Sequence, residues 1–567
     1  MQPKTLLDFA LGSEKSDLVL KSANLVNVCS GEIYKTDIAI AQDLIVGLGR
    51  YSGRKEIDAR DKYAVPGLID GHTHIEMSML SVSEFAKEIV PRGTTAVVAD
   101  PHEIANVLGI EGIRAFLAEA KSTQLKVYCM APSCVPSTNP YLGLETSGAV
   151  ITHDEIRGLL LIDGIIGLAE VMNYGGVIAK EEEIWDKIEV AQGLKMPIDG
   201  HAPLLSGKEL NAYALSGAGS DHESTSYEEA QEKLRLGLRL MVREGSVAKN
   251  LEDIVPLLKT VDTGHCMLVT DGDRTPRDLN DDGYLDYVLR RAIEEGIDPV
   301  KAVQMCTVNT AEWFKLDNII GSISPGKIAD IVLLKHLEKF EVDSVIVNGN
   351  TDFASPSEYK FNYPQYGKSV RIKQVKPDDF AIPQVGQKKA RIIGLIKGEL
   401  LTEEFVAEIS GIDIARDILK IAVVERHHYS GNIGLGFVKG FGLKGGALAS
   451  TIAHDSHNIV VIGTNEADMA FACNRLKAIG GGIVLCCGRE VTCELELPIA
   501  GLMSDKGLDY VIKKQKELET NISECGCKLQ TPSITMSFLA LPVIPKLKIT
   551  DKGLVDVERR EIVDIFL

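Results

Sequence analysis

The stretch that decides the fold is Ala64-Val65-Pro66-Gly67-Leu68-Ile69-Asp70-Gly71-His72-Thr73-His74-Ile75. It begins as an apolar run typical of a buried strand and ends in two histidines one residue apart. Because side chains alternate along an extended strand, His72 and His74 face the same side. Imidazole is the commonest metal ligand in proteins, so this arrangement indicates metal binding. The motif alone is weak evidence, since two such histidines also occur as hydrogen-bonded structural residues.

Seven further apolar runs follow, each ending in a polar or ionisable cluster. They span residues 94–103, 126–136, 164–173, 196–203, 218–226, 239–246 and 265–273. Helical patterns lie between several of them, at 109–124, 181–195 and 227–237. Eight strand-then-helix units predict an α/β fold, a (β/α)8 TIM-like barrel whose functional groups stand at the carboxyl ends of the strands.

Ionisable side chains stand at or just after the ends of these runs. They are His72, His74, His102, Glu170, His201, His222 and Asp271. Taken singly, each histidine can be a satisfied core or loop residue, and each carboxylate a helix N-cap. Their occurrence together, with five of the chain's 12 histidines at strand ends, predicts a metal site at one rim of the barrel.

These residues resemble the pattern of the amidohydrolase superfamily, and GSISPGKIADIVLL at 321–334 resembles its return strand after the barrel. Within the superfamily, nearly the whole chain is similar to the bacterial adenine deaminases. The shared motifs are GHTHIEMSM, DPHEIANVLG, LAEVMN, DGHAP, SDHES, AHDSHN and ELPIAGLMSD. Hydantoinases, dihydroorotases and ureases commonly carry a carboxylated lysine after the fourth strand. Glu170 stands there in this chain, which disfavours the cyclic-amide hydrolases.

The resemblance implies hydrolytic deamination of adenine to hypoxanthine and ammonia, a purine salvage reaction, by a hydroxide held between two divalent ions. It implies His72, His74 and Asp271 as ligands of one ion, His201 and His222 as ligands of the other, and Glu170 as the bridge. Mn(II) or Fe(II) is favoured, and Zn(II) suits the same ligands. The alternatives are an amidohydrolase acting on another nucleobase or on a cyclic amide or amidine, and a catalytically inactive amidohydrolase-like scaffold.

The proposed chemistry also needs proton transfer. Asp271 is the expected shuttle, taking the proton of the attacking water and passing it to the leaving amino group. Protonation of the purine ring needs another donor, and Glu76, His102 and Glu103 are the candidates. The structural alternatives are that Glu76 caps a helix and that His102 orients a metal ligand through a hydrogen bond.

The barrel is predicted to span residues 66–324, and the segments on either side of it have a different hydrophobic pattern. Residues 1–65 and 325–380 predict a small β-sandwich built from both flanks, because apolar and polar residues alternate there between turns. The helical stretch 285–314 is expected to join the last barrel strand to this sandwich. Residues 353–380 lack periodicity and are predicted to be a linker.

Residues 381–567 predict a C-terminal α+β domain of the adenine deaminase type. Its glycine-rich segment 432–447 matches neither a dinucleotide fingerprint nor a Walker A loop, so tight turns and close backbone packing are expected. His454, Asp455 and His457 gather coordinating and proton-moving groups within four residues. We expect them to cover the barrel mouth; the alternative is a polar turn in an oligomerisation or stability module.

Composition limits the partners. With 80 acidic and 61 basic residues, the formal net charge of −19 disfavours nucleic-acid binding and favours a small molecule such as adenine. The N-terminus has no apolar signal region, and no run of eighteen apolar residues occurs, so neither export nor membrane insertion is expected. Eleven cysteines without the density of a disulfide scaffold suit a reducing cytoplasm. A homo-oligomer, dimer or higher, is also expected.

Overall fold

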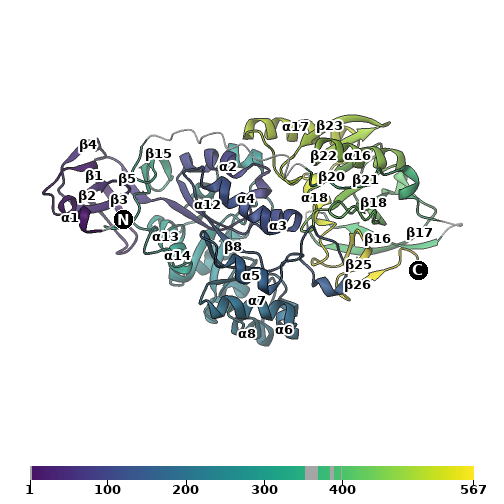
Figure 1. Ribbon diagram of the computed structural model, residues 1–567, viewed down its shortest axis with the longest axis horizontal. Coiled ribbons are helices and arrows are strands. Elements are labelled where there is room, and N and C mark those ends of the chain that lie inside the picture. The colour runs from purple at the N-terminus through teal and green to yellow at the C-terminus, as the bar shows by residue number, and fades with distance from the viewer. Residues whose placement is uncertain (1–2, 352–367, 384–387, 398) are drawn as a thin grey trace.

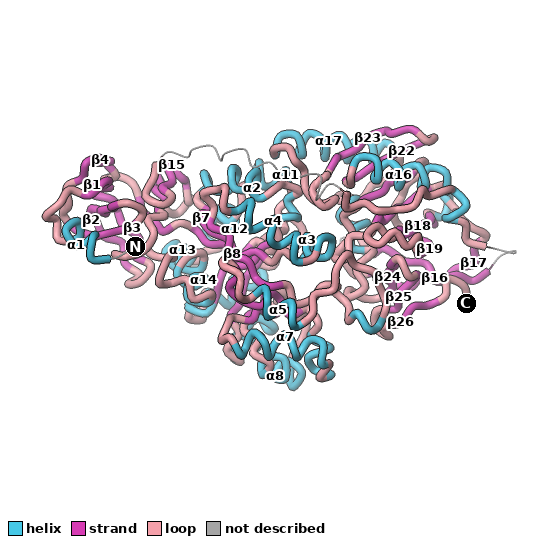
Figure 2. Tube along the Cα trace, viewed as in Figure 1, coloured by secondary structure: helices cyan, strands magenta, loops and turns pink. Residues whose placement is uncertain are grey.

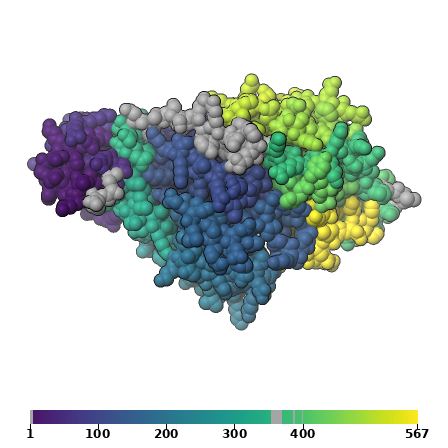
Figure 3. All heavy atoms as spheres, in the orientation of Figure 1, coloured from purple at the N-terminus to yellow at the C-terminus, as the bar shows by residue number. Residues whose placement is uncertain are grey.

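The computed structural model describes residues 3–351, 368–383, 388–397 and 399–567. It is elongated: an N-terminal sheet stands at one end, the barrel lies in the middle and a C-terminal unit forms the other end (Figure 1). The barrel, in blue, and the C-terminal unit, in green and yellow, are in contact (Figure 3).

The middle part is a closed parallel barrel. Its strands are β6 (Leu68–Thr73), β7 (Thr94–Ala99), β8 (Lys126–Ala131), β9 (Ile165–Val171), β10 (Ile198–Gly200), β11 (Ser220–Asp221), β12 (Arg239–Arg243) and β13 (Cys266–Val269). Strands β6 to β10 pair in one sheet and β11 to β13 in another. The Gly219 N–H donates to the Ile198 carbonyl at 3.0 Å, and the Asp271 N–H to the His72 carbonyl at 3.1 Å. These bonds join the two sheets, and the predicted barrel is confirmed.

Helices surround the barrel strands (Figure 2). They are α2 (Val82–Ile89), α3 (His102–Leu108), α4 (Ile110–Ala120), α5 (His153–Leu159), α6 (Tyr174–Ala179), α7 (Glu182–Gly193), α8 (Gly207–Leu215), α9 (Tyr227–Arg235), α10 (Leu251–Leu258), α11 (Pro276–Asp281), α12 (Leu285–Glu294), α13 (Pro299–Met305) and α14 (Val308–Trp313). Strands β6 and β7 are buried along their whole length, including the polar side chains of Asp70 and Thr94, because helices cover the outside of the barrel and side chains fill its interior. The predicted helical stretch 285–314 is three helices, because Asp298 caps a new helix that starts at Pro299.

Both flanks of the barrel contribute to one seven-stranded mixed sheet. The N-terminal flank provides β1 (Ser16–Asn27), β2 (Glu32–Ala41), β3 (Leu44–Gly49), β4 (Gly53–Asp58) and β5 (Tyr63–Pro66), after the short helix α1 (Leu7–Ala10). The other flank returns as β14 (Ile331–His336) and β15 (Glu341–Ile346). Strand β14 pairs with β5, directly before the first barrel strand, so the two flanks are joined by backbone hydrogen bonds.

The C-terminal unit contains an eight-stranded sheet and a smaller three-stranded sheet. The first is formed by β16 (Lys388–Leu395), β17 (Thr402–Ile409), β18 (Ile418–Val424), β19 (Ile433–Lys439), β20 (Ala447–Ser450), β21 (Ile459–Gly463), β22 (Gly482–Cys487) and β23 (Glu490–Glu496), and the second by β24 (Leu547–Thr550), β25 (Gly553–Asp556) and β26 (Glu561–Val563). The helices are α16 (Glu466–Ile479), α17 (Leu508–Glu524) and α18 (Pro532–Phe538). Close packing in the glycine-rich segment is confirmed at Gly434, where an added Cβ would lie 1.8 Å from the Thr550 carbonyl.

One assignment from the sequence changes. Residues 353–367 of the predicted linker lie outside the described residues. Part of the rest, assigned to the sandwich and the linker, packs on the C-terminal unit instead: Val370, Ile372 and Phe380 share an apolar cluster with Ala422 and Val424 of β18. Burial of these apolar side chains is the physical reason, and the pattern is too short to show a period.

Candidate metal centre at the barrel mouth

The candidate metal ligands come from five strands and meet at one rim. His72 ends β6 with His74 just beyond it, Glu170 lies in β9, and His201, His222 and Asp271 follow β10, β11 and β13. The carboxyl ends of parallel strands lie at the same end of a barrel, so residues two hundred positions apart become neighbours. The rim is largely closed to solvent, since His72, Glu170 and His222 are each at most 3% exposed.

One half of the cluster contains His72, His74 and Asp271. Oδ1 of Asp271 lies 3.3 Å from Nε2 of His72 and 3.3 Å from Nε2 of His74. The aspartate has a left-handed backbone, with φ of 56°. Its amide bond to the His72 carbonyl holds the turn after β13 against the end of β6. Three ligand atoms therefore converge on one point.

Glu170 joins this half to the other. Its Oε1 lies 3.4 Å from Nε2 of His74, and its Oε2 lies 2.7 Å from Nδ1 of His201 and 3.3 Å from Nε2 of His222. The two carboxylate oxygens thus face different histidine pairs. This is the arrangement that a carboxylate bridging two ions needs.

The protonation pattern of the histidines fits divalent ions. Nδ1 of His74 lies 3.0 Å from the Asp100 carbonyl, to which it donates, so Nε2 offers its lone pair to the cluster. Nε2 of His72 is buried without a hydrogen-bond partner among the described residues. Nδ1 of His201 and Nε2 of His222 are 3.2 Å apart beside the same carboxylate oxygen. Imidazole and carboxylate donors placed in this way suit Mn(II), Fe(II) and Zn(II).

The imidazoles also set the charge of the two carboxylates. Burial by itself raises the pKa of Glu170, but His222 and His201 hold that pKa well below its usual value. Burial likewise opposes ionisation of Asp271, while His222, His72, His74 and Arg243 keep its pKa well below the usual range. Both groups are therefore carboxylates at neutral pH, as ligands must be.

Arg243 and Glu223 belong to this site and were not assigned a role from the sequence. Arg243, at the end of β12, donates to Oδ2 of Asp271 at 2.8 Å and forms a two-pronged ion pair with Glu223. Glu223 in turn lies 3.5 Å from Nε2 of His222. The available signal was their position, since Glu223 directly follows His222 and Arg243 lies within the seventh apolar run. No local sequence pattern indicated that Glu223 and Arg243 form an ion pair, because they lie at the ends of different strands.

The three acid-base candidates lie beside the ligand cluster. Glu76 belongs to the short 3₁₀ helix Ile75–Ser78 and accepts the Ile104 N–H at 3.1 Å, while its Oε2 has no hydrogen-bond partner in the described part of the chain. Burial raises the pKa of Glu76 to about 7. Nδ1 of His102 lies 3.1 Å from Asp100 and 3.7 Å from Glu170. Glu103 turns away from the cluster and toward the C-terminal unit.

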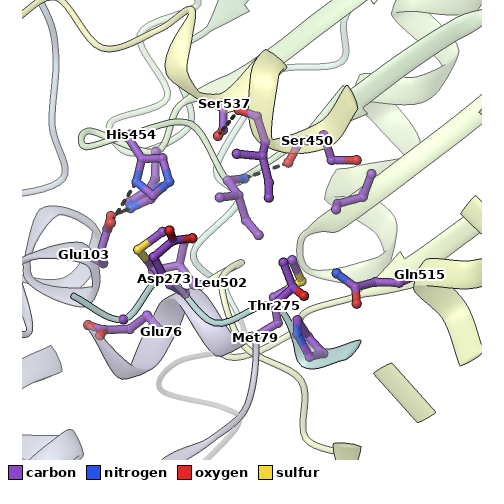
Figure 4. A pocket seen from close by; sticks show the side chains of 18 of the residues that line it. Glu76, Met79, Glu103, Asp273, Thr275, Ser450, His454, Leu502, Gln515 and Ser537 are labelled. Carbon is purple, nitrogen blue, oxygen red and sulfur yellow. Dashed lines mark hydrogen bonds and ion pairs between the residues drawn. The ribbon is translucent and has the colours of Figure 1, made fainter. Parts of the chain in front are cut away.

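The C-terminal cluster reaches the barrel mouth of its own chain. Nδ1 of His454 lies 2.7 Å from Oε1 of Glu103, and His457 contacts the other oxygen of that carboxylate. Asp455, joined to His454 by a cis peptide bond, is buried, and its Oδ2 has no hydrogen-bond partner within the ranges that the structure describes. A pocket lies between the two units, and Glu76, Glu103, Asp273 and His454 are among the residues that line it (Figure 4).

Comparison with known proteins agrees with this geometry. Residues 63–351 match the Amidohydrolase family and residues 397–561 match the Adenine deaminase C-terminal domain. A curated adenine deaminase of Archaeoglobus fulgidus is 51% identical, over 99% of this chain and 98% of its own length. The chain belongs to the adenine deaminase family. Adenine deaminases of Thermosipho melanesiensis and Clostridium acetobutylicum are 45% and 41% identical; the alignments cover 100% and 97% of this chain and 100% and 98% of theirs.

Two further observations bear on the sequence predictions. Among the described residues, no helix combines the length and apolar character needed to span a bilayer. All eleven cysteines lie in the described part of the chain and are free thiols.

Proposed function

We propose that this protein hydrolyses adenine to hypoxanthine and ammonia with two divalent ions held at the barrel mouth. The observation that carries the proposal is the pair of histidine sets facing opposite oxygens of Glu170. The choice of adenine as substrate rests on the family, because its curated members are named adenine deaminase. When bound, the ions would supply the Lewis acidity that makes water a usable nucleophile near neutral pH.

The residues of the chain have separate tasks in this proposal. His72, His74 and Asp271 would hold one ion, His201 and His222 would hold the other, and Glu170 would provide an oxygen to each. Asp271 accepts a proton from the attacking water and delivers it to the departing amino group. Arg243 fixes Oδ2 of Asp271, so that Oδ1 stays aimed at the histidines.

A proton must also reach the purine ring as the C6 carbon becomes tetrahedral. Glu76 suits this role best, because its Oε2 is buried beside the pocket with no partner among the residues that the structure describes, and burial raises its pKa to about 7. His102 and Glu103 are the other candidates. Both are engaged, His102 with Asp100 and Glu103 with the C-terminal histidines, and this favours a positioning role for them.

The remaining parts of the proposal concern the metal and the setting. Mn(II) or Fe(II) is the proposed metal, with Zn(II) as the alternative that the same ligands accept. A cytoplasmic location is proposed on the sequence grounds given above and on the free state of all eleven thiols. A homo-oligomer is proposed by family resemblance alone.

The test is metal content measured together with ammonia release. Protein reconstituted with Mn(II) or Fe(II) should contain close to two ions per chain and release ammonia from adenine. Glu170→Gln should lose ions or activity, because an amide is a poor bridge. A wild-type protein that stays without stoichiometric metal after supplementation would refute the metal mechanism. Full loading without ammonia release from adenine would refute the substrate assignment and leave another amidohydrolase activity or an inactive scaffold.

A further inference from the structure

The pocket between the barrel and the C-terminal unit lies directly beside the proposed metal centre. On the barrel side, its lining includes Glu76, two residues after His74, and Gly272, the neighbour of Asp271. On the other side, the C-terminal unit closes it with Ile452, His454 and Leu502 among others. A small molecule over the metal centre would therefore touch both units.

The lining matches the chemistry of a nucleobase. Its walls are mostly apolar, from side chains such as Met79, Ile452, Ile483 and Leu502, and suit the faces of an aromatic ring. The ionisable groups Glu76, Glu103 and His454 stand together at one end (Figure 4). Pockets with apolar walls and a few placed polar groups bind and orient flat heterocycles.

His454 is held in one orientation with one nitrogen left over. Nδ1 is engaged by Glu103 at 2.7 Å, and the ring packs on Phe538 with a centroid distance of 4.6 Å. Nε2 of His454 has no hydrogen-bond partner among the described residues, although the side chain is only 7% exposed. A polar atom that faces a pocket and has no protein partner is available to hydrogen-bond a ligand.

Glu103 and the two histidines also have the residue types of a metal site, but the hydrogen bonds favour another use. Nδ1 of His457 accepts the Ala453 N–H at 3.2 Å, so Nε2 carries the ring proton and donates it to Glu103. That proton occupies the position a metal would need. The carboxylate is therefore held between two N–H groups and serves to orient His454.

We infer that the purine base binds in this interdomain pocket and that Nε2 of His454 forms a hydrogen bond with the ring, which makes His454 a specificity-determining residue supplied by the C-terminal unit. This inference rests on the proposed function. Burial lowers the pKa of His454, but the Glu103 carboxylate outweighs burial and raises it above its usual value. A raised pKa favours the protonated ring, in which Nε2 donates a hydrogen bond to an acceptor nitrogen of the base. Glu103 acts through His454 and is a positioning residue.

The test compares His454→Ala with His428→Ala in metal-replete protein. His428 also belongs to the C-terminal unit and contacts the barrel, through Nε2 and the Ser147 carbonyl at 2.8 Å, but it lies outside the pocket lining. We expect His454→Ala to raise the KM for adenine about tenfold or more, as for a lost hydrogen bond to a charged group, with a smaller change in kcat. His428→Ala should leave the KM unchanged, and His454→Gln, which keeps a donor, should recover part of the loss.

Deaza analogues identify the contact itself. In the wild type, either 3-deazaadenine or 7-deazaadenine should compete with adenine about tenfold more weakly than the other, because it lacks the nitrogen that accepts from His454. In His454→Ala that difference should disappear, as in a double-mutant cycle. A KM within twofold of wild type in folded, metal-replete His454→Ala overturns the inference, as does an equal loss in His428→Ala or a persistent difference between the analogues. Failure of the wild type to release ammonia would instead refute the proposed function.

Discussion

At the scale of single residues, Asp271 connects the parts of the site. Its Oδ1 faces His72 and His74, and its Oδ2 faces Arg243. Its backbone has a positive φ, a conformation that asparagine and aspartate adopt more readily than most other side chains. Position 271 thus combines a required backbone conformation with a required charge.

Substituting Asp271 by asparagine tests the charge at position 271 without changing the backbone requirement. Asp271→Asn keeps a residue suited to positive φ but loses the proton-accepting carboxylate, so we expect kcat for adenine to fall by about 10²- to 10⁴-fold. Steady-state kinetics on protein of measured metal content checks this. A variant that retains both ions and turns over at nearly the wild-type rate would remove Asp271 from proton transfer.

At the scale of elements, the turn after β13 must approach the end of β6 very closely. Gly272 follows Asp271 with φ of +65°, and a Cβ there would lie 2.6 Å from the carbonyl oxygen of His74. A side chain at position 272 would push the turn away from the end of β6, where His72 and His74 lie. Gly272 therefore supports the proposed metal site although it supplies no ligand.

Gly272→Ala is expected to lower metal content and activity together. Gly207→Ala is the matched control, because Gly207 also has positive φ, +59°, but open space around its Cβ position. The control should show only the cost of the backbone conformation, about 1 to 2 kcal/mol. Thermal unfolding and bound metal measured on both variants compare the two effects. Equal behaviour of the two variants would mean that the close approach has no consequence.

At the scale of the whole molecule, the barrel and the C-terminal unit are joined by many polar contacts. Asp551 accepts from the Thr146 N–H at 2.9 Å and from its hydroxyl at 2.7 Å, and Asn458 donates to the Thr146 carbonyl at 2.7 Å. On the other side of the pocket, the Ser504 N–H donates to the Met79 carbonyl at 2.8 Å. These hydrogen bonds hold the C-terminal unit, which forms one wall of the pocket, against the barrel.

Burial of Lys548 should make the free energy of unfolding of the protein depend on pH. Its Nζ donates to the carbonyls of Leu400 and Phe538, and burial lowers its pKa to about 7. Between about pH 7 and the ordinary lysine value, the unfolded chain holds a proton that the folded chain lacks. The free energy of unfolding therefore rises with pH across that window. Below about pH 7, Lys548 is charged in the folded protein as well, and the full cost of burying that charge lowers the stability.

Lys548→Met removes this titration. The variant should unfold at a higher temperature than the wild type near pH 6, and its advantage should shrink as the pH rises toward 10. Lys121→Met, at a side chain 71% exposed, is the control and should shift the unfolding temperature little at any pH. An advantage of Lys548→Met that does not change with pH would contradict the assignment.

The sequence by itself determined the barrel and the candidates for its metal ligands. Parallel strands buried on both faces appear as apolar runs, and the residue that ends each run must lie at the rim, so His72, Glu170 and Asp271 could be found without coordinates. The C-terminal histidines were found from their local spacing. Both inferences rest on information that lies within a few residues of chain.

Only the tertiary structure decided which of these residues meet. Glu103 and His457 are separated by 354 positions and contact each other, and Arg243 pairs with Asp271 from a different strand. No local pattern records such contacts, because they depend on how strand ends and whole units pack. The interdomain pocket, the orientation of His454 and the packing of Val370 and Phe380 on the C-terminal sheet follow from that packing. The hydrophobic periodicity of the sequence determines where strands and helices form. Burial and hydrogen bonding between residues far apart in the chain determine which of these elements pack together.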